Sequence, residues 1–187
     1  MRIISGKYKN KKLDFEENFK TRPLKDSVKE NIFNILKHSN KINVPIKNSN
    51  ILDLYAGTGS FGLECLSRDA SHVFFAENDK DALKNLNKNI KNLSVENQTM
   101  ISTLDISNGL GKLVFEEKFD LVFIDPPYID KKYINIIKEI KRKNIMNNKH
   151  ILILHREKNS DSNLSNYINI IESRTYGRSE IFFGRLF

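Results

Sequence analysis

A predicted strand, a glycine-rich turn and a predicted helix follow one another at residues 51–55, 56–62 and 63–68. Glycine has no Cβ, so a turn of this kind lets the backbone approach a ligand closely. The N–H groups at the start of the following helix then face that ligand. In open α/β sheets such ligands bind at the carboxyl ends of the strands. The order of elements therefore predicts an α/β fold with a binding site at that edge of the sheet.

The glycines of this turn also match the fingerprint of dinucleotide-binding folds. Gly57, Gly59 and Gly62 have the G-x-G-x-x-G spacing, and Glu77 ends the next predicted strand, residues 72–77. An acid near that position binds the ribose hydroxyls in nicotinamide enzymes. An enzyme that uses a nicotinamide cofactor is therefore one candidate.

A second informative stretch is Asp125-Pro-Pro-Tyr128, which follows the apolar run of residues 119–124. An apolar run this short is typical of a buried strand. Two prolines end the strand ladder and stiffen the loop, so they fix the Asp125 carboxylate and the Tyr128 ring beside them. A rigid carboxylate next to an aromatic ring is suited to hold a planar base with an exocyclic amine. The alternative for the tetrapeptide alone is an ordinary turn at the end of a strand.

Two features favour S-adenosylmethionine over a dinucleotide. Asp53 lies four residues before Gly57, where its carboxylate can orient a positively charged amino acid group but would repel a pyrophosphate. The glycine turn also occurs together with Asp125-Pro-Pro-Tyr128. We expect Glu77 to bind the ribose hydroxyls and Asp105 to face the adenine amine. The residues expected to contact the cofactor are Asp53, Tyr55, Gly57, Gly59, Glu77, Asn78 and Asp105.

Length and composition indicate one enzyme domain. The chain has 187 residues, enough for a sizeable core but too few for two full α/β domains. The single cysteine, Cys65, excludes an internal disulfide and fits a reducing compartment. No apolar run reaches membrane-spanning length, and no signal-peptide pattern is present. The four histidines show no metal-ligand spacing, so we expect no metal. A cytoplasmic monomer is the resulting prediction.

The positive charge is concentrated near the amino terminus. Of the net charge of +8, residues 1–48 carry +7, with twelve Lys or Arg against five Asp or Glu. We therefore predict a basic extension over residues 1–48 and a catalytic domain over residues 49–187. A basic extension on a nearly neutral body favours a polyanionic partner. The alternative is a solvated surface that is rich in lysine.

The extension itself is predicted to contain a β-hairpin and a helix. Residues 2–6 and 12–15 read as short strands around a basic tip. Ser27 and Glu30 match a capping box for a helix whose apolar positions dock on the body. The residues expected to contact a polyanion are Lys7, Tyr8, Lys9, Lys11, Lys12 and Arg22.

The rest of the chain alternates between strands and helices. Further strands are predicted at residues 100–104 and 151–154, with amphipathic helices before and between them. Residues 167–171 and 180–187 bracket Tyr176-Gly177 as a terminal antiparallel hairpin. This pattern predicts a doubly wound, Rossmann-like sheet of seven strands, as in class I methyltransferases.

At the level of motifs, the chain resembles the RsmD family of bacterial methyltransferases. The similar segments are residues 2–6, 12–13, 21–23, 28–30, 33–36, 53–59, 62–64, 66–68 and 125–128, and they span nearly the whole length. The amino-terminal segments are the specific part, because many amino-methyltransferases share the others. In one departure, Ser27 stands where the family usually has arginine. The resemblance implies methylation of a guanine N2 amine in 16S ribosomal RNA, with the RNA or a partly assembled 30S subunit as partner.

The chemistry of such a site can be argued from its residues. An exocyclic amine is a weak nucleophile because its lone pair is delocalised into the ring. Asp125 and the backbone carbonyl of Pro126 can accept the two amine protons, and Tyr128 can stack on the base, so these three are the expected catalytic residues. Positioning and electrostatics then supply the catalysis. An adenine-N6 nucleic-acid methyltransferase and an inactive RNA-binding module are the alternatives, and a nicotinamide enzyme ranks last.

Overall fold

The computed structural model describes residues 1–15, 24–160 and 163–187. The predicted contact Arg22 lies outside these ranges. In chain order the helices and strands are α1 (Asp26–His38), β1 (Asn50–Leu54), α2 (Ser60–Ser67), β2 (His72–Ala76), α3 (Lys80–Leu93), β3 (Thr99–Ser102), β4 (Phe119–Ile124), α4 (Tyr133–Lys143), β5 (Met146–Glu157), β6 (Ile168–Tyr176) and β7 (Ser179–Leu186). Short 3₁₀ turns precede β3 and β6.

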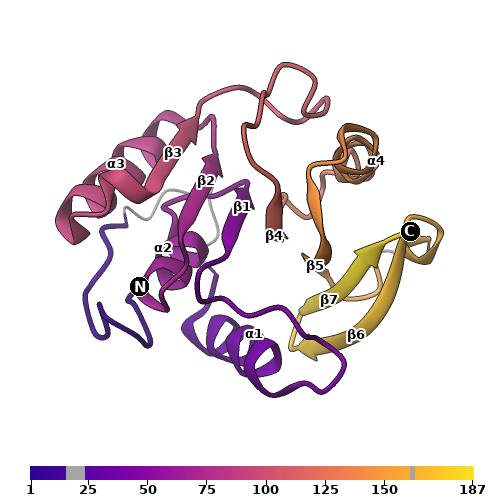
Figure 1. The fold of residues 1–187 in the computed structure, drawn as a ribbon, viewed down its shortest axis with the longest axis horizontal. Helices are drawn as coiled ribbons and strands as arrows, with labels where there is room; N and C mark the ends of the chain where they lie inside the picture. The colour runs from indigo at the N-terminus through magenta and orange to yellow at the C-terminus, as the bar shows by residue number, and fades with distance from the viewer. Residues whose placement is uncertain (16–23, 161–162) are drawn as a thin grey trace.

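The strands form one seven-stranded sheet in the order β3-β2-β1-β4-β5-β7-β6 (Figure 1). β1 to β5 pair in parallel, whereas β7 runs antiparallel to both β5 and β6. The predicted doubly wound sheet and its terminal antiparallel hairpin are therefore confirmed. The order reverses between β1 and β4, and their carboxyl ends meet at the point where α/β folds bind their ligands.

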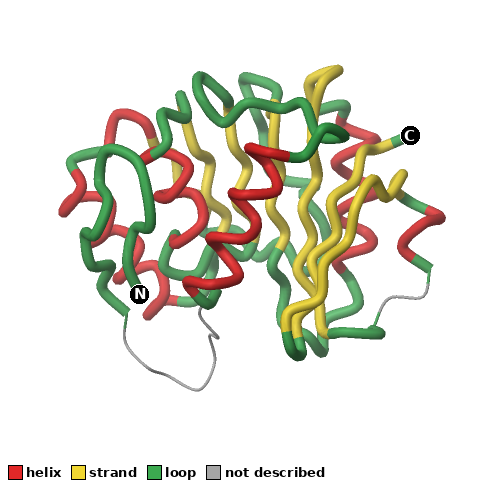
Figure 2. The backbone as a smooth tube through the Cα atoms, turned by 90° about the horizontal axis from the view of Figure 1, so that it is seen from below, coloured by secondary structure: helices red, strands yellow, loops and turns green. Residues whose placement is uncertain are grey.

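Helices cover both faces of the sheet (Figures 1 and 2). Alternate residues of a strand point to opposite faces, so each buried strand contributes to two cores. Ile51 and Phe123 pack in one core with α1, α2 and α3. Leu52 and Ile124 pack in the other core, with α4 and the chain between β3 and β4. Strands buried on both faces explain why their sequences are continuous apolar runs.

The amino-terminal extension packs as part of this body. Ile3, Leu13 and Phe33 belong to the same core as α2 and α3. Instead of the regular hairpin expected over residues 2–15, an isolated antiparallel bridge joins Arg2 and Lys12. The backbone hydrogen bond from Ile3 N–H to the Lys11 carbonyl extends this contact at 2.9 Å. The segment thus folds back on itself, but too briefly for regular strands.

Helix α1 forms where it was predicted, but the expected capping box is wrong. The helix begins at Asp26, with Lys25 in the N-cap position and no side-chain cap. Ser27 therefore lies inside the first turn, where its hydroxyl cannot act as the N-cap acceptor.

Polar groups of α2 hold the amino-terminal segment in place. The buried Glu64 carboxylate accepts the N–H groups of Ile4 and Ser5, at 2.7 and 3.0 Å. Ser67 accepts the N–H groups of Lys7, through its carbonyl, and Tyr8, through its hydroxyl. Gly6 has a φ of +82°, and a Cβ there would lie 1.7 Å from the Ser67 carbonyl oxygen. Only a glycine permits this close approach.

Candidate functional site

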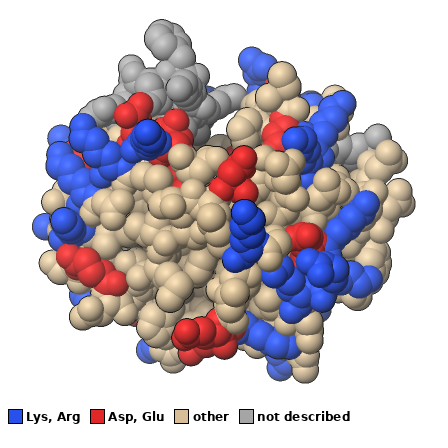
Figure 3. All heavy atoms as spheres, turned by 90° about the horizontal axis from the view of Figure 1, so that it is seen from above, with Lys and Arg blue, Asp and Glu red and all other residues tan. Residues whose placement is uncertain are grey.

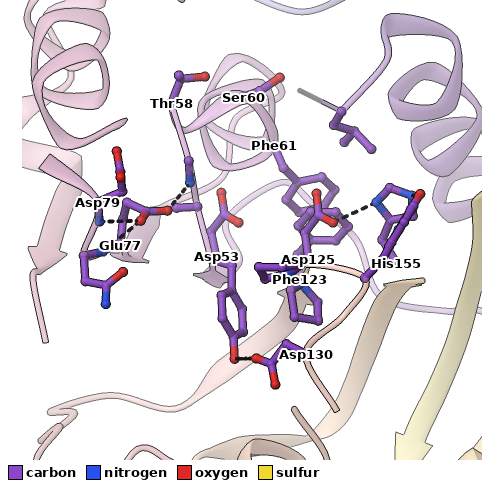
Figure 4. Close-up of a pocket in the computed structure, with 18 of the residues that line it drawn as sticks. Asp53, Thr58, Ser60, Phe61, Glu77, Asp79, Phe123, Asp125, Asp130 and His155 are labelled. Atoms are coloured by element: carbon purple, nitrogen blue, oxygen red, sulfur yellow. Dashed lines mark hydrogen bonds and ion pairs between the residues drawn. The ribbon is translucent and has the colours of Figure 1, made fainter. Parts of the chain in front are cut away.

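A pocket of about 480 Å³ opens at the carboxyl ends of the parallel strands (Figure 4). This volume is within the range of roughly 300–1,000 Å³ that is usual for small-molecule sites. Two loops form its opposite sides: the glycine loop (residues 55–59), which follows β1, and the proline loop (residues 125–130), which follows β4. Met1, Phe15 and Leu24 of the extension add apolar lining. The sheet topology thus brings together residues that are about seventy positions apart in the sequence.

Asp53 lies at the end of β1, beneath the glycine loop. Its carboxylate is 1% exposed and accepts the Gly62 N–H at 2.9 Å. Burial raises the pKa of this carboxyl well above its usual range; the Gly62 hydrogen bond opposes the shift, and the neighbouring acids Asp125 and Glu77 add to it. A cationic ligand group beside Asp53 would favour its ionised form.

Glu77 fixes the glycine loop from the end of β2. One carboxylate oxygen accepts the Gly57 N–H at 2.7 Å, and the other accepts the N–H groups of Asn78 and Asp79, both at 2.8 Å (Figure 4). The predicted ribose acceptor therefore also shapes the backbone around it. Each carboxylate oxygen has two acceptor sites, so three of the four are used and one, on the oxygen bonded to Gly57, remains for a ligand hydroxyl.

The other predicted cofactor residues separate into those that line the pocket and one that does not. Tyr55, Gly57, Asn78 and Asp105 line it. Gly59 is not among the described lining residues: it is the N-cap of α2, with a φ of +80°, and a Cβ there would lie 2.4 Å from Leu86. Its glycine is needed for helix packing.

Two of the lining residues have hydrogen bonds that fix their side chains. The Tyr55 hydroxyl donates to Asp130 at 3.0 Å, which ties the glycine loop to the proline loop. Burial and this carboxylate raise the pKa of the Tyr55 phenol. Asp105 is exposed, and hydrogen bonds from the backbone and side chain of Ser107 lower the pKa of its carboxyl. Asp105 is therefore ionised at the rim of the pocket.

The predicted catalytic residues Asp125, Pro126 and Tyr128 all line the pocket. The Asp125 side chain is 20% exposed. Behind it the rings of Phe61 and Phe123 stack with centroids 4.1 Å apart and form an apolar wall (Figure 4). A carboxylate beside stacked rings, next to a half-buried tyrosine, can accept a donor from a planar ligand held at this wall.

Sequence reasoning missed two residues of β5 that hold the proline loop. His155 Nδ1 lies 2.8 Å from Asp125 Oδ1, and His155 Nε2 lies 3.3 Å from the Tyr128 hydroxyl. Arg156 donates to the carbonyls of Pro127 and Tyr128, at 3.0 and 2.9 Å. One signal was present: both residues directly follow the apolar run 151–154, so they lie at the carboxyl end of the strand beside β4.

The electrostatics of the pocket are strongly acidic. Its described lining includes six acids and no Lys or Arg: Asp53, Glu77, Asp79, Asp105, Asp125 and Asp130. Like charges this close favour a cationic ligand and disfavour an anionic one such as a pyrophosphate.

Among the described residues no group of His, Cys, Asp and Glu has the arrangement of a metal site. In the part of the chain that the structure describes, no helix is long and apolar enough to cross a membrane.

The RNA contacts predicted for the extension are mostly exposed lysines. Lys7, Lys9, Lys11 and Lys12 are all exposed. Tyr8 is half-buried and packs against the core, with the Lys7 ammonium 5.0 Å from its ring centroid. Tyr8 therefore anchors the turn to the core, and its ring remains partly accessible.

Comparison with known proteins identifies the family. A family model described as "Conserved hypothetical protein 95" matches residues 1–185. The chain belongs to this family, known as RsmD. A methylase of Rickettsia prowazekii, RP545, is 31% identical over 97% of this chain and 95% of its own length. The Ribosomal RNA small subunit methyltransferase D of Buchnera aphidicola from Acyrthosiphon pisum is 36% identical over 84% of this chain and 79% of its own.

Solved structures place the fold of this RsmD-family chain among the class I methyltransferases. The Haemophilus influenzae protein HI0767 is 28% identical, with a TM-score of 0.76 over 100% of this chain and 98% of that one. A precorrin-6y C5,15-methyltransferase of Geobacter metallireducens shares the fold alone, at 15% identity and a TM-score of 0.62 over 91% and 94% of the two chains. The predicted family and fold are thereby confirmed, and the protein is a methyltransferase.

Proposed function

We propose that this protein transfers a methyl group from S-adenosylmethionine to the N2 amine of a guanine in small-subunit ribosomal RNA. The observation that carries the proposal is the acidic pocket in which the glycine loop and the Asp-Pro-Pro-Tyr sequence face each other. Membership of the RsmD family supports the choice of RNA, because relatives at 33–39% identity are named Ribosomal RNA small subunit methyltransferase D. The bacterial cytoplasm is the compartment in which that RNA occurs.

The donor set fits S-adenosylmethionine. We assign Asp53 to its ammonium group, Glu77 to its ribose hydroxyls and Asp105 to its adenine amine. This cofactor carries a sulfonium and an ammonium against one carboxylate, so a pocket with six acids and no described Lys or Arg suits it. The same charge pattern argues against a nicotinamide dinucleotide. When bound, the cofactor supplies an electrophilic methyl group whose sulfonium leaves as a neutral thioether.

The proline loop supplies the acceptors that the amine requires. Asp125 Oδ2 and the Pro126 carbonyl accept hydrogen bonds from the two N2 hydrogens. These bonds localise the nitrogen lone pair and direct it at the methyl carbon. As the N–C bond forms, positive charge develops on N2, and the adjacent carboxylate stabilises it. The amine then gives one proton to Asp125, which releases it to solvent. Tyr128 stacks on the base during these steps.

The first experiment tests cofactor choice by calorimetry on the purified protein. S-adenosylmethionine and S-adenosylhomocysteine should bind, and NAD should not. A transfer assay with a methyl-labelled cofactor and small-subunit RNA should then place the label in RNA. Binding of NAD without binding of either methyl-cycle ligand would contradict the proposal. Methylation of adenine N6 would support the adenine-N6 alternative.

We also propose that residues 1–25 grip the RNA and help to close the site. Met1, Phe15 and Leu24 line the pocket, so the extension already reaches the place where the base would enter. Its exposed lysines can neutralise phosphates, which adds affinity rather than base identity. Figure 3, which views the molecule from above Figure 1, shows Lys and Arg in several separate groups with acidic side chains among them. The extension is therefore one of several candidate RNA-binding surfaces, and it is tested separately.

That test is the salt dependence of RNA binding by a variant in which Lys7, Lys9, Lys11 and Lys12 are changed to Ala. Its log–log slope should fall by about 0.7–0.9 for each phosphate that the variant no longer neutralises. Cofactor affinity should be unchanged. A control of equal charge changes four exposed lysines near the amino ends of the strands: Lys112, Lys118, Lys141 and Lys149. Equal slopes for wild type and the extension variant would show that the RNA grip lies elsewhere.

A further inference from the structure

A chain of hydrogen bonds runs from β7 to the proline loop through His155. Ser179 Oγ lies 3.1 Å from the Tyr128 hydroxyl, which lies 3.3 Å from His155 Nε2. His155 Nδ1 lies 2.8 Å from Asp125 Oδ1 (Figure 4). The imidazole is only 6% exposed, so water competes little for these bonds. The buried His155 ring therefore joins Asp125 and Tyr128, which have separate roles in the proposed reaction.

For an ionised Asp125 and a neutral His155, the chemistry of the groups gives the direction of each bond. An ionised carboxylate can only accept, so Nδ1 of His155 must carry the proton that it shares with Asp125. In a neutral imidazole Nε2 is then an acceptor, and the Tyr128 hydroxyl donates to it. The Tyr128 oxygen in turn accepts from Ser179. In this series of hydrogen bonds every donor points toward Asp125, whose Oδ1 is thereby occupied.

A second clamp on the same loop acts on its backbone. Arg156, the next residue of β5, is 1% exposed, and its guanidinium lies 4.5 Å from the ring centroid of Tyr133. It donates to the carbonyls of Pro127 and Tyr128. Arg156 thus fixes the main chain, and His155 fixes the two side chains that point into the pocket.

We propose that His155 is a positioning residue for methyl transfer, in which its two ring nitrogens have separate tasks. The inference rests on the function proposed above and extends it. Through Nδ1, His155 holds Asp125 Oδ1 and leaves Oδ2 directed at the base amine. Through Nε2, it holds the Tyr128 ring at the angle that stacks on the base. Removal of the first hydrogen bond should lower kcat, and removal of the second should raise KM for RNA.

Two near-isosteric variants separate the two hydrogen bonds. In His155→Asn the amide nitrogen lies near the position of Nδ1, so the bond to Asp125 is kept and the bond to Tyr128 is removed. In His155→Gln the longer side chain reaches the position of Nε2, so the bond to Tyr128 is kept. We expect His155→Gln to lower kcat by about tenfold or more, the effect of one hydrogen bond to a charged group, at little change in KM. His155→Asn should mainly raise KM for RNA.

His150 provides a matched control on the same strand. It is also buried, at 9% exposure, and both of its ring nitrogens are hydrogen-bonded, to the Asn147 carbonyl at 2.7 Å and to the Leu186 N–H at 3.0 Å. It does not line the pocket. The His150→Asn and His150→Gln variants therefore report what the removal of a buried, bonded histidine does to stability alone. Their kcat and KM should equal the wild-type values.

A measurement on the resting protein tests the inference without turnover. Nitrogen-15 NMR of labelled histidine should show His155 as the Nδ1–H tautomer, and Tyr128→Phe should shift the Nε2 signal because it removes the donor to this nitrogen. These results are expected even if the RNA is not the substrate, so they separate a failure of the inference from a failure of the proposed function. An Nε2–H tautomer would overturn the inference. Variants of His155 that change kcat and KM together, or that behave like the His150 controls, would also overturn it.

Discussion

The glycine loop and the proline loop face each other across one pocket, yet different parts of the chain hold them. The glycine loop is fixed mainly from the neighbouring β2 end, by Glu77 and by the left-handed backbone of its own residues. The proline loop is fixed by side chains of β5 and β7, at sequence separations of 27 to 51 residues. Under the function proposed above, the first loop binds the cofactor, and the second is held in place from neighbouring strands to receive the substrate base.

The largest expected effect concerns the proline loop. Asp125→Ala removes the acceptor for the amine and the partner of His155, so turnover should fall by about 10²–10³-fold, as for the removal of a transition-state hydrogen bond. Affinity for S-adenosylmethionine should change little, because the glycine loop is untouched. Single-turnover methylation and calorimetry on the same preparation measure the two quantities. Near wild-type turnover would refute the role of this carboxylate.

Glu77→Ala is the reciprocal change in the glycine loop. It removes the expected ribose contact and leaves the N–H groups of Gly57, Asn78 and Asp79 without their carboxylate acceptor. Cofactor affinity should fall by about 10- to 100-fold, the effect of one hydrogen bond to a charged group. RNA affinity should be retained. If RNA affinity fell as much as cofactor affinity, the two loops would not act separately.

Tyr128→Ala should have a milder effect than Asp125→Ala. Stacking of a base on an aromatic ring contributes roughly 1–3 kcal/mol, which is about 5- to 150-fold in RNA affinity. Tyr128→Phe keeps the ring but loses the hydroxyl bond to His155. Its RNA affinity should therefore fall less than that of Tyr128→Ala and about as much as that of His155→Asn. Equilibrium binding of RNA to the two variants distinguishes stacking from the hydroxyl contact, and an equal decrease in both would argue against stacking.

Asp53→Asn should separate stability from function within the glycine loop. Burial raises the pKa of this carboxyl, so the folded state favours its protonated form, and that contribution to stability is lost as pH rises through the raised pKa. The amide keeps an acceptor for the Gly62 N–H but carries no charge. The variant should therefore be at least as stable as wild type at neutral pH, yet bind S-adenosylmethionine more weakly. Thermal unfolding across pH, with calorimetry, tests both; an unchanged cofactor affinity would exclude Asp53 as the ammonium partner.

Sequence patterns revealed the two loops better than the contacts that hold them, for a physical reason. Strand β4 follows from a local apolar run, and this prediction was confirmed. Asp125 follows that strand directly and lines the pocket. The contacts of His155 and Arg156 depend on which strands become neighbours, and single histidines have no periodicity that reports this. Docking of the extension through Glu64 was missed for the same reason, because its carboxylate meets backbone N–H groups that leave no side-chain signature.

The central claim is methylation of guanine N2 in small-subunit ribosomal RNA, and nucleoside mass spectrometry tests it most directly. A host strain lacking its own RsmD-family enzyme would receive this protein, its Asp125→Ala variant or an empty vector. The account predicts N2-methylguanosine at one additional position in the RNA from the wild-type strain alone. Equal N2-methylguanosine in all three RNAs, or a different methylated nucleoside in the first, would contradict it.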